Sequence, residues 1–166
     1  MTHPGEQFYP RGVRWDDAIA RGTLPDLLSV AAAEFGARPA LEFRDRPIGY
    51  TELEAMVETA ASAFLRAGYG KNTSVALFLG NSPDHPVNFF GALKAGARIV
   101  HLSPLDGEIA LSHKLSDSGA RILVTSNLSA LLPTALKFLN GSLRWGCACR
   151  AGPRGPGGGG RAALAR

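Results

Sequence analysis

The chain has 166 residues, of which 45% are hydrophobic and 19% charged, a composition typical of one globular domain or of part of a larger one. Its net charge of +4 is unevenly distributed. The segment up to Asp117 carries 11 basic and 14 acidic residues, whereas seven basic and no acidic residues follow it. Because the positive excess lies in the tail, the charge does not indicate a nucleic-acid-binding domain.

The sequence carries no visible targeting or membrane signal. The N-terminus, MTHPGEQFYPRG, lacks the apolar segment of a signal peptide, and no stretch approaches the roughly 18 apolar residues of a transmembrane helix. Cys147 and Cys149 are the only cysteines, too few for a closed zinc site or a disulfide framework. We therefore expect a cytoplasmic protein.

Three segments are expected. Residues 1–22 form an irregular lead, in which Tyr9-Pro10 and Trp15 are candidate anchors. Residues 23–139 form an α/β domain, and residues 140–166 form a Gly/Arg/Ala-rich tail. The domain is expected to open with a helix, because Thr23 and Asp26 have the spacing of a capping box. Gly36 ends that helix, whose apolar face is Leu24, Leu27, Leu28, Ala31, Ala32 and Phe35.

A hairpin and a second helix are predicted next. Residues 39–43 and 47–50 flank Arg44-Asp45-Arg46 and are expected to be the strands of the hairpin. Thr51 and Glu54 match a full capping box at the start of the helix. Apolar residues recur along it at helical spacing: Leu53, Met56, Val57, Ala60, Ala61, Phe64 and Leu65.

The rest of the domain is organised around residues 74–105, which predict a strand, a helix and a second strand. The apolar run 75–79 is typical of a strand buried on both faces. Ser82 is expected to cap the helix, with Pro83 at its first position. A further helix from Asp106-Gly107-Glu108, with Ile109, Leu111 and Leu115 on its apolar side, a strand over residues 121–125 and a helix within residues 129–139 follow. This alternation predicts an α/β fold: a parallel sheet with flanking helices.

The composition changes at Gly141. Of the last 26 residues, 20 are Gly, Ala, Arg or Pro, and no hydrophobic period remains. Such a segment is not expected to bury enough surface to offset its ordering entropy. Because these four residue types have GC-rich codons, we favour a frameshifted reading of GC-rich DNA as its origin. A genuine basic tail that binds RNA or an acidic surface is the alternative.

The candidates for chemistry are weak when taken singly. The turn Gly80-Asn81-Ser82-Pro83 lies between a strand and a helix, but lacks the spacing of a dinucleotide loop and the lysine of a Walker loop. A capped turn is therefore the favoured interpretation. The four histidines are His3, His85, His101 and His113. His101 ends a strand at the edge where α/β sheets bind ligands, yet no partner carboxylate is apparent, and His85 is expected on a helix surface.

The acidic residues also have structural explanations. Asp84 and Asp106 are expected at helix starts, favoured by the helix dipole. Four glutamates are expected to be solvated or capping residues: Glu42, Glu52, Glu54 and Glu58. No metalloprotease, nucleophile-elbow or paired-carboxylate pattern occurs. From the residues alone, the chain is an α/β domain without a visible active site.

An ordered set of phrases nevertheless resembles one family. They are "ALEFRDRPIGYTELE", "VALFLGNSP", "GALKAGARIVHLSPL" and "LSDSGARILVTS", and together with Thr23–Leu28 they span roughly residues 23 to 127. In order and spacing they are similar to the opening of the adenylate-forming, acyl-activating enzymes, which include acyl-CoA synthetases. Asn72-Thr73, Gly80 and Ser103 depart from the family pattern in structural turns.

The resemblance implies part of a flavodoxin-like N-terminal subdomain of an AMP-dependent ligase. It also implies a reaction in which carboxylate, ATP and CoA give acyl-CoA, AMP and pyrophosphate, with ATP, Mg and CoA needed by the full-length enzyme. The family's phosphate loop, ribose-binding Asp and catalytic Lys belong to segments downstream of the matched region, which this sequence does not contain. None of the four lysines matches those motifs, so no site residue is carried over from the family. These lysines are Lys71, Lys94, Lys114 and Lys137.

We therefore expect an N-terminal portion of an acyl-CoA synthetase that is inactive as this chain. Two alternatives stay open: a free-standing small α/β binding module with a basic tail, and a truncated product without function. The acyl substrate is expected to be fatty or aromatic, since the lead segment is similar to that of bacterial long-chain or aromatic acyl-CoA ligases.

Overall fold

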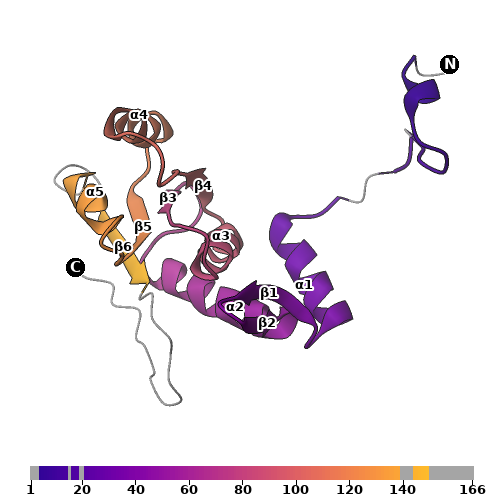
Figure 1. The fold of residues 1–166 in the computed structure, drawn as a ribbon, viewed down its shortest axis with the longest axis horizontal. Helices are drawn as coiled ribbons and strands as arrows, with labels where there is room; N and C mark the ends of the chain where they lie inside the picture. Colours follow the sequence, from indigo (N-terminus) through magenta and orange to yellow (C-terminus); the bar gives the residue numbers. More distant parts are fainter. Residues whose placement is uncertain (1–3, 15, 19–20, 139–143, 150–166) are drawn as a thin grey trace.

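A computed structural model describes residues 4–14, 16–18, 21–138 and 144–149. Within them the chain alternates helices and strands, as the sequence predicts, and forms two separate sheets (Figure 1). No described helix has the length and apolar character needed to cross a membrane. The elements are η1 (Glu6–Phe8), α1 (Leu24–Phe35), β1 (Pro39–Phe43), β2 (Arg46–Gly49), α2 (Tyr50–Arg66), β3 (Ser74–Phe78), α3 (Asp84–Lys94), β4 (Arg98–His101), α4 (Glu108–Ser118), β5 (Ile122–Ser126), α5 (Leu132–Lys137) and β6 (Arg144–Cys149).

The larger sheet has four strands in the order β4-β3-β5-β6, and all of its pairings are parallel. Val75 of β3 lies between Ile99 of β4 and Ile122 of β5. Every residue of β3 and β5 is buried, which confirms that the apolar runs are central strands covered on both faces. Since the chain passes from β3 to one neighbour and then to the other, the order is that of flavodoxin-like sheets.

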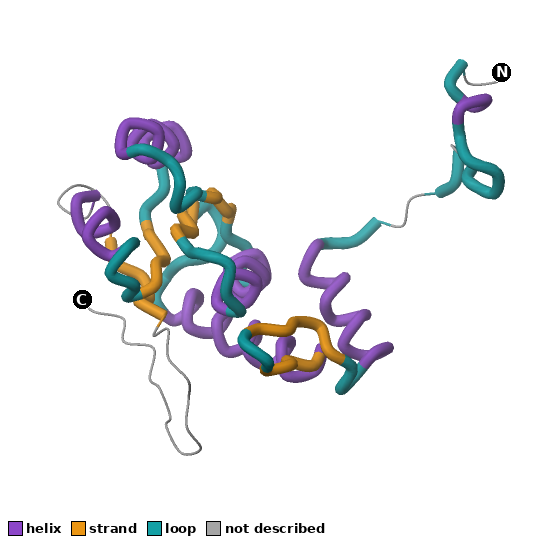
Figure 2. The backbone as a smooth tube through the Cα atoms, viewed as in Figure 1, coloured by secondary structure: helices purple, strands orange, loops and turns teal. Residues whose placement is uncertain are grey.

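Helices cover both faces of this sheet (Figure 2). On one face, Val75 and Leu77 of β3 pack with Phe64 of α2 and Ala92 of α3. On the other face, Phe78 of β3 packs with residues of α4 and α5, among them Leu111, Leu115 and Ala135. The predicted α/β fold with a parallel sheet and flanking helices is confirmed.

The first capping box is formed as predicted, and the second is not. At α1, the Thr23 backbone N–H donates to Asp26 Oδ2 at 2.8 Å, and the Asp26 N–H donates to Thr23 Oγ1 at 3.3 Å. At α2, the helix already begins at Tyr50, with Gly49 as N-cap and no side-chain cap bond. The prediction for Thr51 is therefore wrong: the N-cap is Gly49, two residues earlier, so Thr51 already lies inside the helix.

The capping carboxylate of α1 makes acid stability a testable property. The pKa of Asp26 is lowered, mainly because its carboxylate accepts the Thr23 backbone N–H and then because of the Thr23 hydroxyl. A depressed native pKa stabilises the fold above the unfolded-state pKa, and this contribution is lost as the pH falls through the native value. We expect Asp26→Asn to reduce stability at pH 7 and to leave it unchanged at pH 2, as read from urea unfolding at both pH values. An equal loss at both would contradict this cause.

The hairpin of β1 and β2 turns through two residues with positive φ, Arg44 at 52° and Asp45 at 60°. Two consecutive positive φ angles are those of a type I′ turn, which matches the twist of paired strands. The hairpin packs Ile48 against Leu53 and Val57 of α2. It therefore belongs to one buried core that also includes residues of α1 and α3. The predicted hairpin is confirmed.

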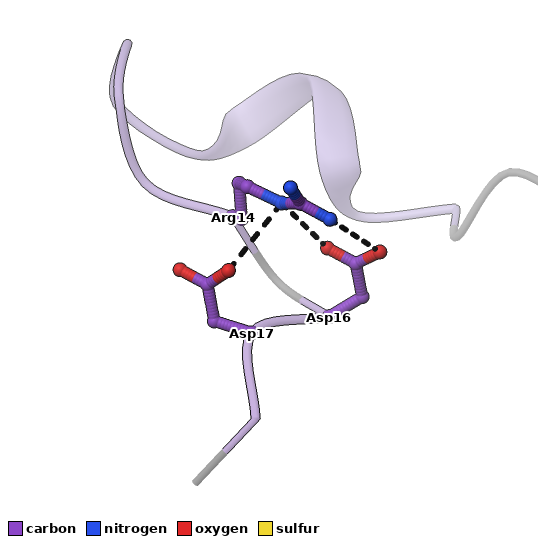
Figure 3. A network of polar contacts seen from close by, with 3 residues as sticks. All are labelled: Arg14, Asp16 and Asp17. Atoms are coloured by element: carbon purple, nitrogen blue, oxygen red, sulfur yellow. Dashed lines mark hydrogen bonds and ion pairs between the residues drawn. The ribbon is translucent and has the colours of Figure 1, made fainter.

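Residues 4–14 and 16–18 lie apart from the helices and sheets (Figure 1). Phe8 is 79% exposed there, and Tyr9 is also exposed, so the proposed Tyr9-Pro10 anchor makes no buried contact. Arg14 holds this segment together locally, because its Nε lies 3.2 Å from Asp16 and 3.3 Å from Asp17 (Figure 3). The other candidate anchor, Trp15, lies outside the described residues.

Several predicted apolar positions are exposed. Ile109 is 89% exposed because α4 begins at Glu108 and turns Leu111 and Leu115 toward the sheet instead. On α1 only Leu28 and Ala32 are buried, whereas Leu24 and Leu27 are 51% and 64% exposed. The expected α1 face is thus only partly covered within the described residues.

The sequence did not predict β6, which pairs with β5 along its outer edge. Residues 144–149 contain no proline, and a strand at a sheet edge is held by backbone hydrogen bonds that need no hydrophobic period. Cys147 and Cys149 therefore lie in a strand. The rest of the tail, residues 150–166, lies outside the described residues, and its proposed origin remains a prediction.

Candidate functional site

The candidate site lies at the carboxyl edge of the parallel sheet. In open α/β sheets ligands bind at this edge, at the point where the strand order reverses. Here that point lies between β3 and β5, whose following segments are the turn Gly80–Pro83 and the loop after Ser126. β4 ends beside β3 with His101, which pairs in register with Leu77.

The turn Gly80–Pro83 does not cap α3 as predicted. The helix begins at Asp84, its N-cap is Pro83 in helical geometry, and no side-chain cap bond forms. Ser82 takes part through its carbonyl, which accepts the His85 N–H at 3.0 Å. The prediction for Ser82 is wrong because the backbone already turns helically at Pro83, so the first turn is closed by carbonyl groups. Asp84 is in the first turn, as predicted from the helix dipole.

A cavity of about 370 Å³ opens between this turn and the hairpin. Leu41, Glu42 and Phe43 of β1 form one wall. The residues of the other wall come from the turn and the start of α3: Asn81, Ser82, Pro83, His85 and Pro86. The sequence analysis did not place the hairpin at this edge; the cavity arises because α2 carries the hairpin and packs against α3.

Two histidines meet beside the cavity. His85 Nε2 lies 3.2 Å from His101 Nδ1, with ring centroids 5.2 Å apart. Phe89, one turn along α3, stacks on His101 at a centroid distance of 5.4 Å and an interplanar angle of 29°. The meeting of the two histidines was not predicted from the sequence, where each was a candidate by itself. The signal that was missed is topological: β3 and β4 are parallel neighbours, so the helix after β3 starts beside the end of β4.

The pKa of His85 is lowered, first because the ring is partly desolvated and second because of His101. Both causes disfavour the imidazolium. His85 is therefore a neutral imidazole near pH 7, with one ring nitrogen available as an acceptor or a metal ligand. His113 lies exposed on α4, and His3 lies outside the described residues.

Ser126, at the end of β5, carries a buried hydroxyl without a hydrogen-bond partner among the described residues. Its side chain is 3% exposed, and an unsatisfied buried hydroxyl costs about 1–3 kcal/mol. We expect Ser126→Ala to raise the free energy of unfolding by about 1 kcal/mol, because it removes this polar atom at nearly constant shape. Urea unfolding measures the change. A loss of stability would instead mean that the hydroxyl is satisfied in solution, for example by a bound water.

The remaining acidic candidates have structural partners. Asp106 lies two residues before α4 and stabilises the loop between β4 and α4. Its carboxylate accepts a hydrogen bond from the Ser103 N–H at 3.1 Å and another from Lys114 at 2.6 Å. The pKa of Asp106 is lowered chiefly by Lys114 and then by the Ser103 N–H. The helix-dipole explanation for Asp106 is thus replaced by loop closure. Glu52 pairs with Arg46 at 2.9 Å.

A comparison of the sequence with known protein families shows to which family the chain belongs. The AMP-binding enzyme family matches residues 28–144, most of the chain. The chain belongs to this family. The matched residues include α2, α3 and the strands β3, β4 and β5.

Individual relatives agree with the family. The chain is 34% identical over 128 residues to a long-chain-fatty-acid–CoA ligase of Yersinia pestis, an alignment that covers 75% of this chain and 23% of the relative. It is 32% identical over 105 residues to 4-coumarate–CoA ligase 3 of Oryza sativa, covering 62% of this chain and 19% of that protein. A solved N-terminal subdomain of Klebsiella oxytoca NpsA, in complex with 3-hydroxyanthranilyl-AMSN, superposes with a TM-score of 0.61 at 28% identity, over 64% of this chain and 28% of that one.

The chain spans about a fifth of the length of the curated relatives it matches. The lysines of this AMP-binding family member have structural roles where the structure describes their partners. Lys94 pairs with Glu58 and Lys137 pairs with Glu108, both at the surface. Together with the Lys114–Asp106 pair, these contacts join neighbouring elements.

The groups that the family implies, Mg and the phosphates of ATP, do not fit the described residues. Mg²⁺ needs several oxygen ligands, and no group of three or more His, Cys, Asp or Glu side chains gathers within residues 4–14, 16–18, 21–138 and 144–149. The turn Gly80–Pro83 has no adjacent lysine or arginine among the residues that line its cavity. We derive no reaction step through these groups.

Proposed function

We propose that this chain is the scaffold-forming N-terminal portion of an ATP-dependent acyl-CoA synthetase. The complete enzyme would convert a carboxylate, ATP and CoA into acyl-CoA, AMP and pyrophosphate. The observation that supports this proposal best is the family match over residues 28–144, which covers α2, β3, α3, β4 and β5. The proposed role of these residues is to position the sheet and its carboxyl edge, not to perform the transfer.

We further propose that the chain alone does not form acyl-adenylate. Adenylate transfer needs charge stabilisation around the phosphates, supplied by preorganised donors. The sequence contains no Ser/Thr/Gly-rich loop ending in Pro-Lys-Gly, and three of its four lysines are engaged in surface ion pairs. No positive group lines the described cavity. This supports a scaffold role for the sheet edge.

The proposed acid substrate of the complete enzyme is a fatty or an aromatic carboxylate. The relatives named above include a long-chain-fatty-acid–CoA ligase and a 4-coumarate–CoA ligase, at 34% and 32% identity. The two identities are too close to separate the classes. The described cavity has apolar walls at Leu41 and Phe43, which suits either acid.

A free-standing α/β binding module is the second candidate, because the cores on both faces of the sheet are fully formed. Thermal unfolding separates the two. A monomer with a cooperative transition and a native near-UV spectrum supports the module. A scaffold portion is expected to self-associate instead, since α1 leaves Leu24 and Leu27 exposed.

The DNA of the gene beyond the codon for Asn140 tests the parent enzyme directly. We expect another reading frame to continue into a segment like Thr-Ser-Gly-Thr-Thr-Gly, followed by the rest of the family's motifs. This result would also explain the Gly/Arg/Ala-rich residues 141–166 as a frameshift product. If no reading frame beyond this codon encoded the family's further motifs, and the tail bound RNA, both the parent enzyme and the frameshift origin of the tail would be contradicted.

A further inference from the structure

We infer that His85 and His101 together bind a divalent first-row transition-metal ion, such as Zn²⁺ or Ni²⁺, at the carboxyl edge of the sheet. The two rings come from different elements: His85 from the first turn of α3 and His101 from the last position of β4. The proposed scaffold role uses neither ring, so the site lies outside the proposed function.

The distance between the two nitrogens fits chelation. Zinc binds imidazole nitrogen at about 2.0–2.1 Å, so two nitrogens on one tetrahedral ion lie roughly 3.3 Å apart. His85 Nε2 and His101 Nδ1 lie 3.2 Å apart. An ion bound to both nitrogens would lie to one side of the line that joins them, so each ring would turn its lone pair toward that side.

The protonation states also suit a metal. A metal ion binds neutral imidazole, so binding is expected to weaken at acidic pH. In the metal-free pair, one ring nitrogen donates its hydrogen to the other. When the ion binds both lone pairs, that proton moves to the second nitrogen of the same ring, so two neutral rings release no net proton.

The surroundings hold the pair in place. Phe89 stacks on His101 and limits its rotation, while the backbone N–H of His85 is fixed by the Ser82 carbonyl. No third His, Cys, Asp or Glu side chain joins the two rings within the part of the chain that the structure describes. Two protein ligands leave the other coordination positions to water, so we expect reversible binding that follows the order Ni²⁺ tighter than Zn²⁺.

The test is a Zn²⁺ titration of the full 166-residue chain at pH 7.5, followed by the ring-proton NMR signals of each histidine. We expect the signals of His85 and His101 to shift together with one apparent Kd, while His113 stays unchanged. Mg²⁺ at the same concentrations is expected to shift neither ring, because it prefers oxygen ligands. Equal responses of all histidines, or none at His85 and His101, would overturn the inference.

Matched variants complete the test. His101→Asn is expected to raise the apparent Kd read from the His85 signals at least tenfold. His85→Gln is expected to raise the apparent Kd read from the His101 signals by a similar factor. His113→Asn, on the surface of α4, should leave both responses as in the wild type. Dispersed amide spectra confirm that each variant is folded. A His85 response that survives His101→Asn unchanged would show that the two rings do not share an ion and would refute the proposal.

Discussion

Replacing Gly91 with valine is expected to lower the free energy of unfolding of the chain by about 3 kcal/mol or more. Gly91 is buried in α3, and a Cβ atom there would lie 2.7 Å from Ala60 Cβ and 3.2 Å from the Ala61 backbone nitrogen of α2. Real Cβ atoms essentially never lie 2.7 Å from another heavy atom, so the two helices would have to move apart. Overpacking of this kind costs about 1–3 kcal/mol, and the close backbone contact places Gly91→Val at or above the upper end.

Such a loss is large compared with a total stability of about 5–15 kcal/mol. Gly80→Val is the matched control, because a Cβ at Gly80 would meet nothing within 4 Å. The control is expected to change the free energy of unfolding by no more than about 1 kcal/mol. Urea unfolding followed by circular dichroism measures both. Equal effects of the two variants would mean that α2 and α3 do not pack as described.

Truncating Leu77 to alanine is expected to lower the free energy of unfolding by about 2–5 kcal/mol. Leu77 is fully buried in the centre of β3 and packs among Phe64, Ala92 and Val124. Removing its side chain leaves a cavity that the central strands cannot close. For a domain of this size the loss corresponds to a drop of about 5–15 °C in the melting temperature.

Leu105→Ala is the control for this prediction, since Leu105 is 95% exposed. It is expected to change stability by less than about 0.5 kcal/mol. Differential scanning calorimetry of both variants provides the comparison. If Leu77→Ala were as mild as Leu105→Ala, β3 would not be the central strand of the sheet in solution.

The elements of the fold were predictable where local signals and burial agree. The apolar run of β3 and the alternation of strands with helices were enough to predict the parallel sheet, because strands covered on both faces need no polar positions. Thr23 and Asp26 predicted the start of α1 correctly because the two partners of the cap lie close together in the sequence.

Predictions failed where tertiary packing sets a boundary. Thr51 and Ser82 have good capping residue types, yet neither side chain caps a helix. The N-cap of α2 is the extended Gly49, and that of α3 is Pro83, which is already in helical geometry. Ile109 fits the helical period of α4 but lies exposed in its first turn, whereas Leu111 and Leu115 are buried. β6 depends on backbone pairing, which hydrophobic patterning does not report.

The candidate site was the least predictable part. Gly80–Pro83 and His101 were each identified, but their meeting with His85 and the hairpin depends on contacts between segments far apart in sequence. Knowing that β3 and β4 are parallel neighbours would have brought His85 and His101 together. The cavity wall at Leu41 and Phe43 needs the packing of α2 against α3, which the sequence does not encode locally.

The central claim is that this AMP-binding family member forms the framework of an acyl-CoA synthetase without performing the adenylation step. ATP–pyrophosphate exchange, measured on the purified 166-residue chain with a panel of long-chain fatty and aromatic acids, tests it most directly. A full-length long-chain-fatty-acid–CoA ligase serves as the positive control. We predict no acid-dependent exchange above the enzyme-free blank, whereas acid-dependent exchange that scales with the concentration of this chain would contradict the account.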